Sequence, residues 1–299
     1  MSSLRDRPAD EPLFGAWALA LAEDQGRDAA FRWLARSDEP EARGLRAALE
    51  AGFAHAGASR DVLAKGLAHE RWGQHAGARA HLLSLALMAQ LQLSLTCEPC
   101  LGDKNPDLLI ARGEQRALVE VRSLTGCGEE PWTRDAAPRR RAPVRPLRGH
   151  GSGREKQARR RARVAASERA QAAADDAREL SRAVAQAVSV KVDTYAALAA
   201  QHELPLVVLL YEDTDSQLGR VVARWGRDDG AWARAPERFS ALSSVLVVGR
   251  GVADDGACLL RAERLVNAHA ARPLPDTLLP LRLAPQIVPG PPPINPAGR

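Results

Sequence analysis

Aromatic residues are scarce in this sequence, at 4% of its 299 positions, and Ala, Leu and Val make up most of the hydrophobic 45%. An aliphatic core favours helices packed on a sheet over an aromatic-rich β-sandwich. No apolar run reaches the roughly 18–20 residues of a membrane span. The charged start, MSSLRDRPADEP, also lacks the apolar stretch of a secretory signal. These absences argue against a membrane protein and favour a cytoplasmic one.

Cysteine and lysine are scarce as well. Four cysteines are too few for a disulfide framework in a chain of this length. Cys97 and Cys100 have the spacing of zinc ligands, but no second pair follows at a suitable interval. Ordinary cysteines at the end of a strand are therefore the simpler interpretation. Only four of the 42 basic residues are lysines, so each lysine that remains is informative.

The net charge of +5 originates in one segment. Between Arg134 and Arg169 there are 13 basic and 3 acidic residues, whereas acidic residues are in excess over the rest of the chain. Attraction for a polyanion is therefore expected in this segment, with a solvated Arg-rich linker as the alternative. The arginines predicted to contact nucleic acid phosphates are Arg139, Arg140, Arg141, Arg159, Arg160, Arg161 and Arg163.

The composition predicts two folded parts and two unfolded ones. Residues 1–60 are expected to form a small helical N-terminal module, and residues 61–285 an α/β core. A Pro-, Gly- and Arg-rich stretch at about residues 131–153 cannot bury apolar surface and is predicted to be a disordered basic insert. The Pro-rich residues 286–299 are predicted to be a disordered tail.

Within the core, the hydrophobic pattern changes from helical to extended. A helix over AHLLSLALMAQL is followed by three predicted strands, LQLSLTCEP, PDLLIA and ALVEVRS, of which the last two form a hairpin. A long helix over about residues 154–201 and two buried strands, LPLVVLLY and ALSSVLVVG, follow. A hairpin among alternating helices and strands predicts a mixed central sheet flanked by helices.

Two carboxylates are expected to meet on this hairpin. Asp107 begins its first strand, and Glu120 and Arg122 lie two residues apart on its second, so that their side chains share a face. Two carboxylates beside a cation form a hard-oxygen site, which suits Mg²⁺ or Mn²⁺ together with waters and phosphate oxygens. A metal ion at such a site would polarise a phosphodiester and activate a water molecule.

The long helix carries an apolar stripe that includes a lysine. The stripe runs from Leu180 to Leu198 at steps of three and four residues, and Lys191 lies on it. Burying an ammonium without a partner is costly, so Asp107 or Glu120 is the expected partner of Lys191. The alternative is a lysine at the sheet edge whose ammonium reaches solvent.

These features resemble the PD-(D/E)xK nuclease superfamily, which has the restriction-endonuclease-like fold. The resemblance covers about residues 75–250 and rests on the helix–β–β–β–helix–β order, on Pro106-Asp107, and on the apolar residues before Glu120. Lys191-Val-Asp-Thr-Tyr195 stands at the place of the family's Gln-x-x-x-Tyr helix motif. The resemblance implies a restriction-endonuclease-like core and metal-dependent cleavage of DNA phosphodiester bonds, with Asp107 and Glu120 as the metal ligands.

The chain departs from the family pattern at two positions. Arg122 stands where the family has a catalytic lysine; an arginine cannot exchange a proton at working pH, but it can stabilise charge on a phosphate. His81 lies near the place of an acidic residue on the first core helix. The resemblance implies that Lys191, a catalytic lysine moved to the second helix, or Arg122 orients water or stabilises charge. Tyr195 would brace that helix.

Two other classes of function remain open. The first is a catalytically degenerate nuclease fold that binds nucleic acid or a partner protein without cutting. The second is a structural interaction protein whose N-terminal helices dock a partner. Two converging carboxylates favour the nuclease, because a protein that only binds has no need to keep them.

Overall fold

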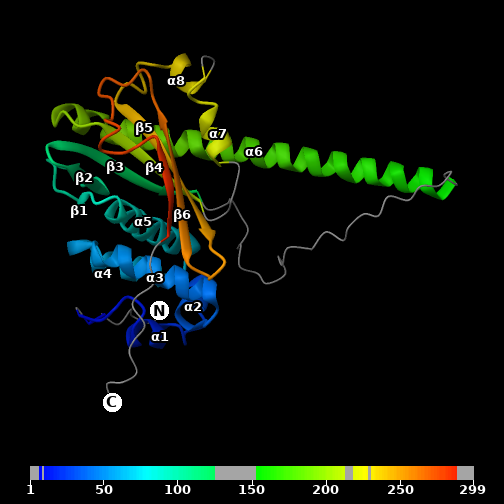
Figure 1. Cartoon of the computed structure of the whole chain (residues 1–299), viewed down its shortest axis with the longest axis horizontal. Helices are drawn as coiled ribbons and strands as arrows, with labels where there is room; N and C mark the ends of the chain where they lie inside the picture. Colours follow the sequence, from blue (N-terminus) through cyan, green and yellow to red (C-terminus); the bar gives the residue numbers. More distant parts are fainter. Residues whose placement is uncertain (1–6, 9, 125–152, 213–217, 228–229, 288–299) are drawn as a thin grey trace.

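A seven-stranded mixed sheet forms the centre of the fold (Figure 1). The computed structural model describes residues 7–8, 10–124, 153–212, 218–227 and 230–287. The order of the strands in the sheet follows their order in the chain. The strands are β1 (Ser94–Cys97), β2 (Leu108–Arg112), β3 (Gln115–Ser123), β4 (Leu206–Glu212), β5 (Leu242–Val252), β6 (Cys258–Val266) and β7 (Arg282–Ile287).

The sheet combines antiparallel and parallel pairs. Strands β1, β2 and β3 form an antiparallel meander, β3, β4 and β5 are parallel to one another, and β6 and β7 return antiparallel. A parallel pair requires a long crossover, and α6 (Gly153–Gln201) provides the one between β3 and β4. The predicted mixed α/β sheet and the predicted hairpin, now β2–β3, are therefore confirmed.

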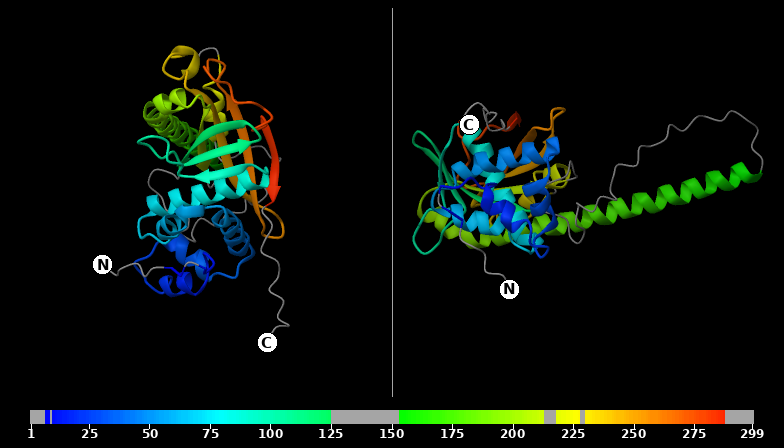
Figure 2. Two further views of the ribbon diagram at one scale, coloured as in Figure 1. Left: turned by 90° about the vertical axis from the view of Figure 1, so that its left-hand side faces the viewer. Right: turned by 90° about the horizontal axis from the view of Figure 1, so that it is seen from below.

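One face of the sheet is covered by the N-terminal helices, with α5 directly against the strands (Figure 2). These elements are α1 (Ala16–Leu21), α2 (Ala29–Arg36), α3 (Pro40–Ala54), the 3₁₀ turn η1 (Gly57–Ser59), α4 (Arg60–Leu67) and α5 (Trp72–Gln90). Their apolar side chains share one core with this face of the sheet. Helices α3 and α5 cross closely at Gly52, where an added Cβ would lie 1.9 Å from the Leu82 carbonyl oxygen.

Local sequence signals explain where some of these helices begin. The Asp28 side chain accepts a hydrogen bond at 2.8 Å from the Ala30 N–H and so caps α2. Pro40 begins α3, where its fixed φ suits the first turn and its missing N–H is not needed. The helices predicted from the N-terminal pattern are thus confirmed, while the division at residue 60 stays a prediction.

The other face of the sheet packs against the C-terminal half of α6 and against α7 (Leu218–Ala223). Val184 and Val188 of α6 are buried there, as the apolar stripe predicts, and so is Val192. The N-terminal part of α6 extends away from the sheet (Figures 1 and 2). A short helix, α8 (Ala231–Arg234), lies between α7 and β5 in the chain. Among the described helices, none has both the length and the hydropathy of a membrane span.

Some elements were not predicted from the sequence. The predicted strands and the long helix correspond to β1–β5 and α6, but β6, β7, α7 and α8 were missed. The predicted start of the disordered tail is wrong, because Gln286 and Ile287 belong to β7 and pair with β6. Gly153, placed in the predicted insert, begins α6. Residues 131–152 and 288–299 lie outside the described part of the chain.

Candidate active site

The hairpin brings Asp107 and Glu120 together through its backbone. The register pairs Leu108 with Val119, so Asp107 and Glu120 occupy the next position along the ladder. The Asp107 N–H donates to Glu120 Oε1 at 3.0 Å, and the Val121 N–H donates to Asp107 Oδ2 at 2.7 Å. Each carboxylate is therefore held by the strand opposite, as the spacing in the sequence predicts.

Lys191 completes this cluster from α6, which packs on the face of the sheet opposite the N-terminal helices. Its Nζ donates to Glu120 Oε2 and lies 3.4 Å from Asp107 Oδ2. The side chains are 15% exposed for Lys191, 0% for Glu120 and 27% for Asp107. The predicted ion pair of Lys191 with Asp107 or Glu120 is confirmed, and both carboxylates take part in it. The alternative of a lysine reaching into solvent is wrong.

Tyr195 joins α6 to the loop that precedes Asp107. Its hydroxyl donates to the Asn105 carbonyl oxygen at 3.3 Å, and its ring centroid lies 5.5 Å from Lys191 Nζ. Lys104, in the same loop, donates from Nζ to the Thr194 carbonyl oxygen. The sequence reasoning did not identify Lys104, although the scarcity of lysine was a signal for it. Together these contacts hold the start of β2 against α6.

The charges in the cluster perturb one another. Burial and the neighbouring Asp107 raise the pKa of Glu120 from 4.5 to about 7, although Lys191 opposes this shift. Burial alone would lower the pKa of Lys191, but Asp107 and Glu120 outweigh it and raise this pKa. Lys191 therefore stays protonated, whereas Glu120 gains or loses a proton near neutral pH.

His81 of α5 lies within reach of the same charges. It is 8% exposed, and burial lowers its pKa, against the opposing effect of Asp107. Its Nε2 atom is buried and has no hydrogen-bond partner among the described residues. A neutral imidazole with a free nitrogen therefore lies beside the carboxylate cluster, at the position predicted on the first core helix.

Of the predicted arginines, Arg122 is the one whose side chain the structure describes. Arg122 is exposed and forms no ion pair with Asp107 or Glu120. The backbone positions of Arg159, Arg160, Arg161 and Arg163 are on α6, but their side chains are not among those described. Arg139, Arg140 and Arg141 lie outside the described residues. The predicted contacts of these arginines with nucleic acid stay predictions.

The two carboxylates have the donor chemistry that Mg²⁺ prefers, which is one or two carboxylates completed by waters and phosphate oxygens. The ammonium of Lys191 already contacts one oxygen of each carboxylate, Glu120 Oε2 and Asp107 Oδ2. Among the described residues, no group of three or more His, Cys, Asp or Glu side chains is placed to hold a metal ion. A metal ion here would thus need ligands from water and substrate.

Comparisons with known proteins add no further guide to this site. Searches of family models, of curated proteins and of solved structures found no match to the chain. The chemistry of the site is therefore the basis for inferring function.

Proposed function

We propose that this chain is a divergent restriction-endonuclease-like protein that cleaves DNA phosphodiester bonds with Mg²⁺ or Mn²⁺. The observation that carries the proposal is the convergence of Asp107, directly before β2, with Glu120 of β3 and Lys191 of α6. A salt bridge with a single carboxylate would be enough to neutralise Lys191. A second carboxylate, fixed by two backbone hydrogen bonds, instead makes a site suited to a divalent cation.

The order of the elements supports the same proposal. Helix α5, strands β1, β2 and β3, helix α6 and strand β4 follow one another as the resemblance implies. The strand that carries Glu120 is central in the sheet and pairs with β4 in parallel, so its carboxylate has a rigid base. Catalytic groups need such support, because small displacements of reacting groups reduce the rate strongly.

In this proposal each residue has a distinct role. Asp107 and Glu120 would hold the metal ion, which when bound polarises the phosphate and lowers the pKa of a water molecule. Lys191 stays protonated and stabilises negative charge on the phosphate, because its raised pKa makes it a poor base. Tyr195 positions Lys191, and the neutral His81 imidazole can accept a proton. Arg122, exposed on β3 two residues after Glu120, contacts the DNA phosphate backbone.

A second candidate function has its own supporting observation. Lys191 forms ion pairs with both carboxylates without any metal ion, and no three-ligand group is present among the described residues. These two facts favour a degenerate nuclease fold that binds nucleic acid without cutting it. Only a measurement of metal-dependent chemistry separates the two candidates.

The test is cleavage of supercoiled plasmid and of labelled linear DNA, with Mg²⁺, with Mn²⁺ and with a chelator. We expect the wild type to cut only with metal and Lys191→Met to be inactive, because its methylenes are kept while the charge is lost. Lys65→Met, the same substitution on α4, serves as the matched control and should cut normally. If Lys191→Met cuts as well as the wild type, Lys191 has no catalytic role and Arg122 takes its place. If no protein cuts with either metal, the binding function is favoured.

A further inference from the structure

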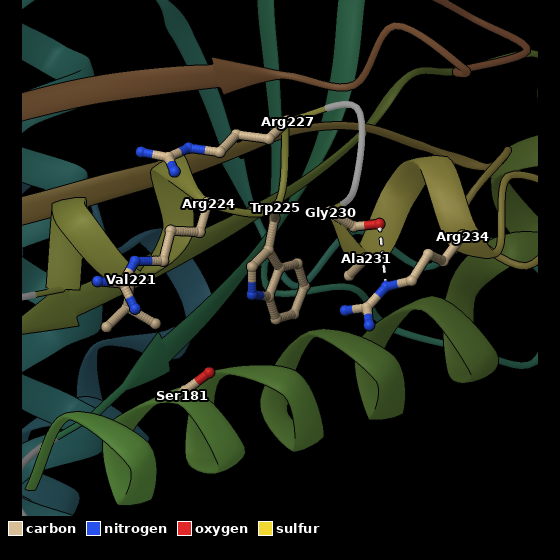
Figure 3. Close-up of a pocket in the computed structure, with 8 residues that line it drawn as sticks. All are labelled: Ser181, Val221, Arg224, Trp225, Arg227, Gly230, Ala231 and Arg234. Atoms are coloured by element: carbon tan, nitrogen blue, oxygen red, sulfur yellow. Dashed lines mark hydrogen bonds between the residues drawn. The ribbon is translucent and has the colours of Figure 1, made fainter. Parts of the chain in front are cut away.

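A cavity of about 300 Å³ lies between α6 and the segment that contains α7 and α8 (Figure 3). It shares no lining residue with the cluster formed by Asp107, Glu120 and Lys191. Ser181 of α6 lies on one side of it, and the segment after α7 lies on the other. Its volume is near the lower end of the roughly 300–1,000 Å³ found for ligand pockets.

Arginine dominates the polar lining of this cavity. Arg224, Arg227 and Arg234 line it, and no carboxylate does so among the described residues. Arg224 and Arg227 form no ion pair with a described residue, and the Arg234 Nε donates only to the Gly230 carbonyl oxygen, at 3.4 Å. Asp228 and Asp229, which follow Arg227 in the sequence, lie outside the described residues. Three like charges around one cavity repel each other, and a bound anion relieves this repulsion.

The shape and chemistry of the lining select among anions. Trp225 stands between Arg224 and Arg234 (Figure 3). It is 6% exposed and packs against Trp232 and Phe239, with ring centroids 6.5 and 6.1 Å away. An indole buried to this extent is a rigid wall and leaves no free face on which a base could stack. Guanidinium groups donate two parallel hydrogen bonds to phosphate oxygens, so a phosphate group suits the cavity.

The position of the cavity relates it to the candidate active site. Ser181 precedes Lys191 by ten residues on α6, which corresponds to about 15 Å along the helix axis. Duplex DNA advances about 3.4 Å per base pair, so this distance corresponds to roughly four base pairs. Towards its N-terminus, α6 continues into the Arg-rich stretch that includes Arg159 and Arg163.

We propose that this cavity binds a backbone phosphate of DNA, about four base pairs from the phosphate at the cluster of Asp107, Glu120 and Lys191. The inference rests on the proposed function for the identity of its ligand, because that function supplies DNA as the substrate. The cavity thereby fixes the register of the duplex along α6.

The test is the affinity for a labelled DNA duplex, measured by fluorescence anisotropy over a range of salt concentrations with a chelator present. The triple variant Arg224→Gln, Arg227→Gln and Arg234→Gln should bind at least about tenfold more weakly than the wild type. Its slope of log affinity against log salt should be shallower by about 0.9, the value for one lost phosphate contact. The control triple, with the same charge change at exposed positions elsewhere, is Arg116→Gln, Arg261→Gln and Arg282→Gln.

Three results would overturn the inference. The first is wild-type affinity and salt slope in the cavity variant, and the second is an equal loss in both triples, which would reflect net charge alone. The third is a rise in the melting temperature of the wild type with inorganic phosphate that is absent in the cavity variant, while the DNA affinity of the variant is unchanged. The cavity would then bind free phosphate and not DNA. Since binding is measured without metal, a protein that never cuts DNA can still show the predicted loss. Likewise, a protein that cleaves DNA can lack the predicted loss of affinity in the cavity variant.

Discussion

The candidate active site and the arginine-lined cavity both border α6, but they differ in how charge is compensated. In the active site, the ammonium of Lys191 is buried between the carboxylates of Asp107 and Glu120. In the cavity, the guanidinium groups of Arg224 and Arg227 are exposed and have no ion-pair partner among the described residues. One site pairs its cation with two carboxylates, whereas the described lining of the other has arginines and no carboxylate.

This difference shows which site the fold itself requires. Removing one member of a buried ion pair leaves the other uncompensated, so substitution of Lys191 should reduce stability whether or not the cluster is catalytic. An exposed charge has no such role, because water solvates it at little cost. Stability measurements should therefore respond strongly to substitutions in the first site and weakly to substitutions in the second.

The largest effect on stability is expected for Lys191→Met. Removing one partner of a buried ion pair leaves the other uncompensated, which costs about 3–5 kcal/mol in the free energy of unfolding at about pH 8. At about pH 5.5 the cost should shrink, because Glu120, with a pKa of about 7, is then already protonated in the wild type. Urea denaturation at both pH values measures this, with Lys65→Met as the control. A loss of under about 1 kcal/mol at the higher pH would contradict a buried, mutually dependent pair.

The next effect concerns the proton on Glu120. Because the pKa is raised from 4.5 to about 7, the folded protein keeps a proton that the unfolded chain has lost. The stability from this proton is fully present below pH 4.5 and is lost as the pH rises through 7. Relative to Glu120→Gln, the wild type should thus lose up to about 3 kcal/mol between these limits. Parallel stability curves for the two proteins would show that Glu120 does not titrate in this range.

The smallest effect, with the opposite sign, is expected at the cavity. The triple variant Arg224→Gln, Arg227→Gln and Arg234→Gln should keep or slightly raise the free energy of unfolding, within about 0.5 kcal/mol, because repulsion among exposed charges is relieved. Urea denaturation at low salt, where screening is weakest, measures this change in the free energy of unfolding. A loss of more than about 1 kcal/mol would mean that these arginines support the fold, which would remove the contrast between the two sites.

The parts of the fold predicted from the sequence are those with a strong local signal. The apolar runs of β2, β3 and β4 and the alternation in the segment of β1 identify these strands without reference to the rest of the chain. Buried and more exposed side chains also alternate along β6, but charged residues at its outward positions, such as Arg261 and Glu263, interrupt the apolar pattern in the sequence. For β7, pairing with β6 decides the structure, because Pro285 within the segment argues against a strand on local grounds.

The candidate site divides in the same way. Asp107 and Glu120 were predictable because the register of a short hairpin follows from the lengths of its strands and turn. Lys191 was predictable because a charge on an apolar helical stripe requires a partner. Lys104 and the arginine-lined cavity were not, since each depends on how a loop or a short helix packs against α6. The sequence pattern does not report how a loop or a short helix packs against a helix elsewhere in the chain.

The most direct test of the proposed nuclease site is the melting temperature with and without metal at about pH 8, above the pKa of Glu120, where a proton no longer competes with the metal. At metal concentrations about tenfold above Kd, Mg²⁺ or Mn²⁺ should raise the melting temperature of the wild type by about 3–5 °C. Asp107→Asn should reduce this shift, and the double variant Asp107→Asn with Glu120→Gln should abolish it. No metal-dependent shift in the wild type, or an equal shift in the double variant, would contradict the metal site and leave Lys191 as the only cation that these carboxylates bind.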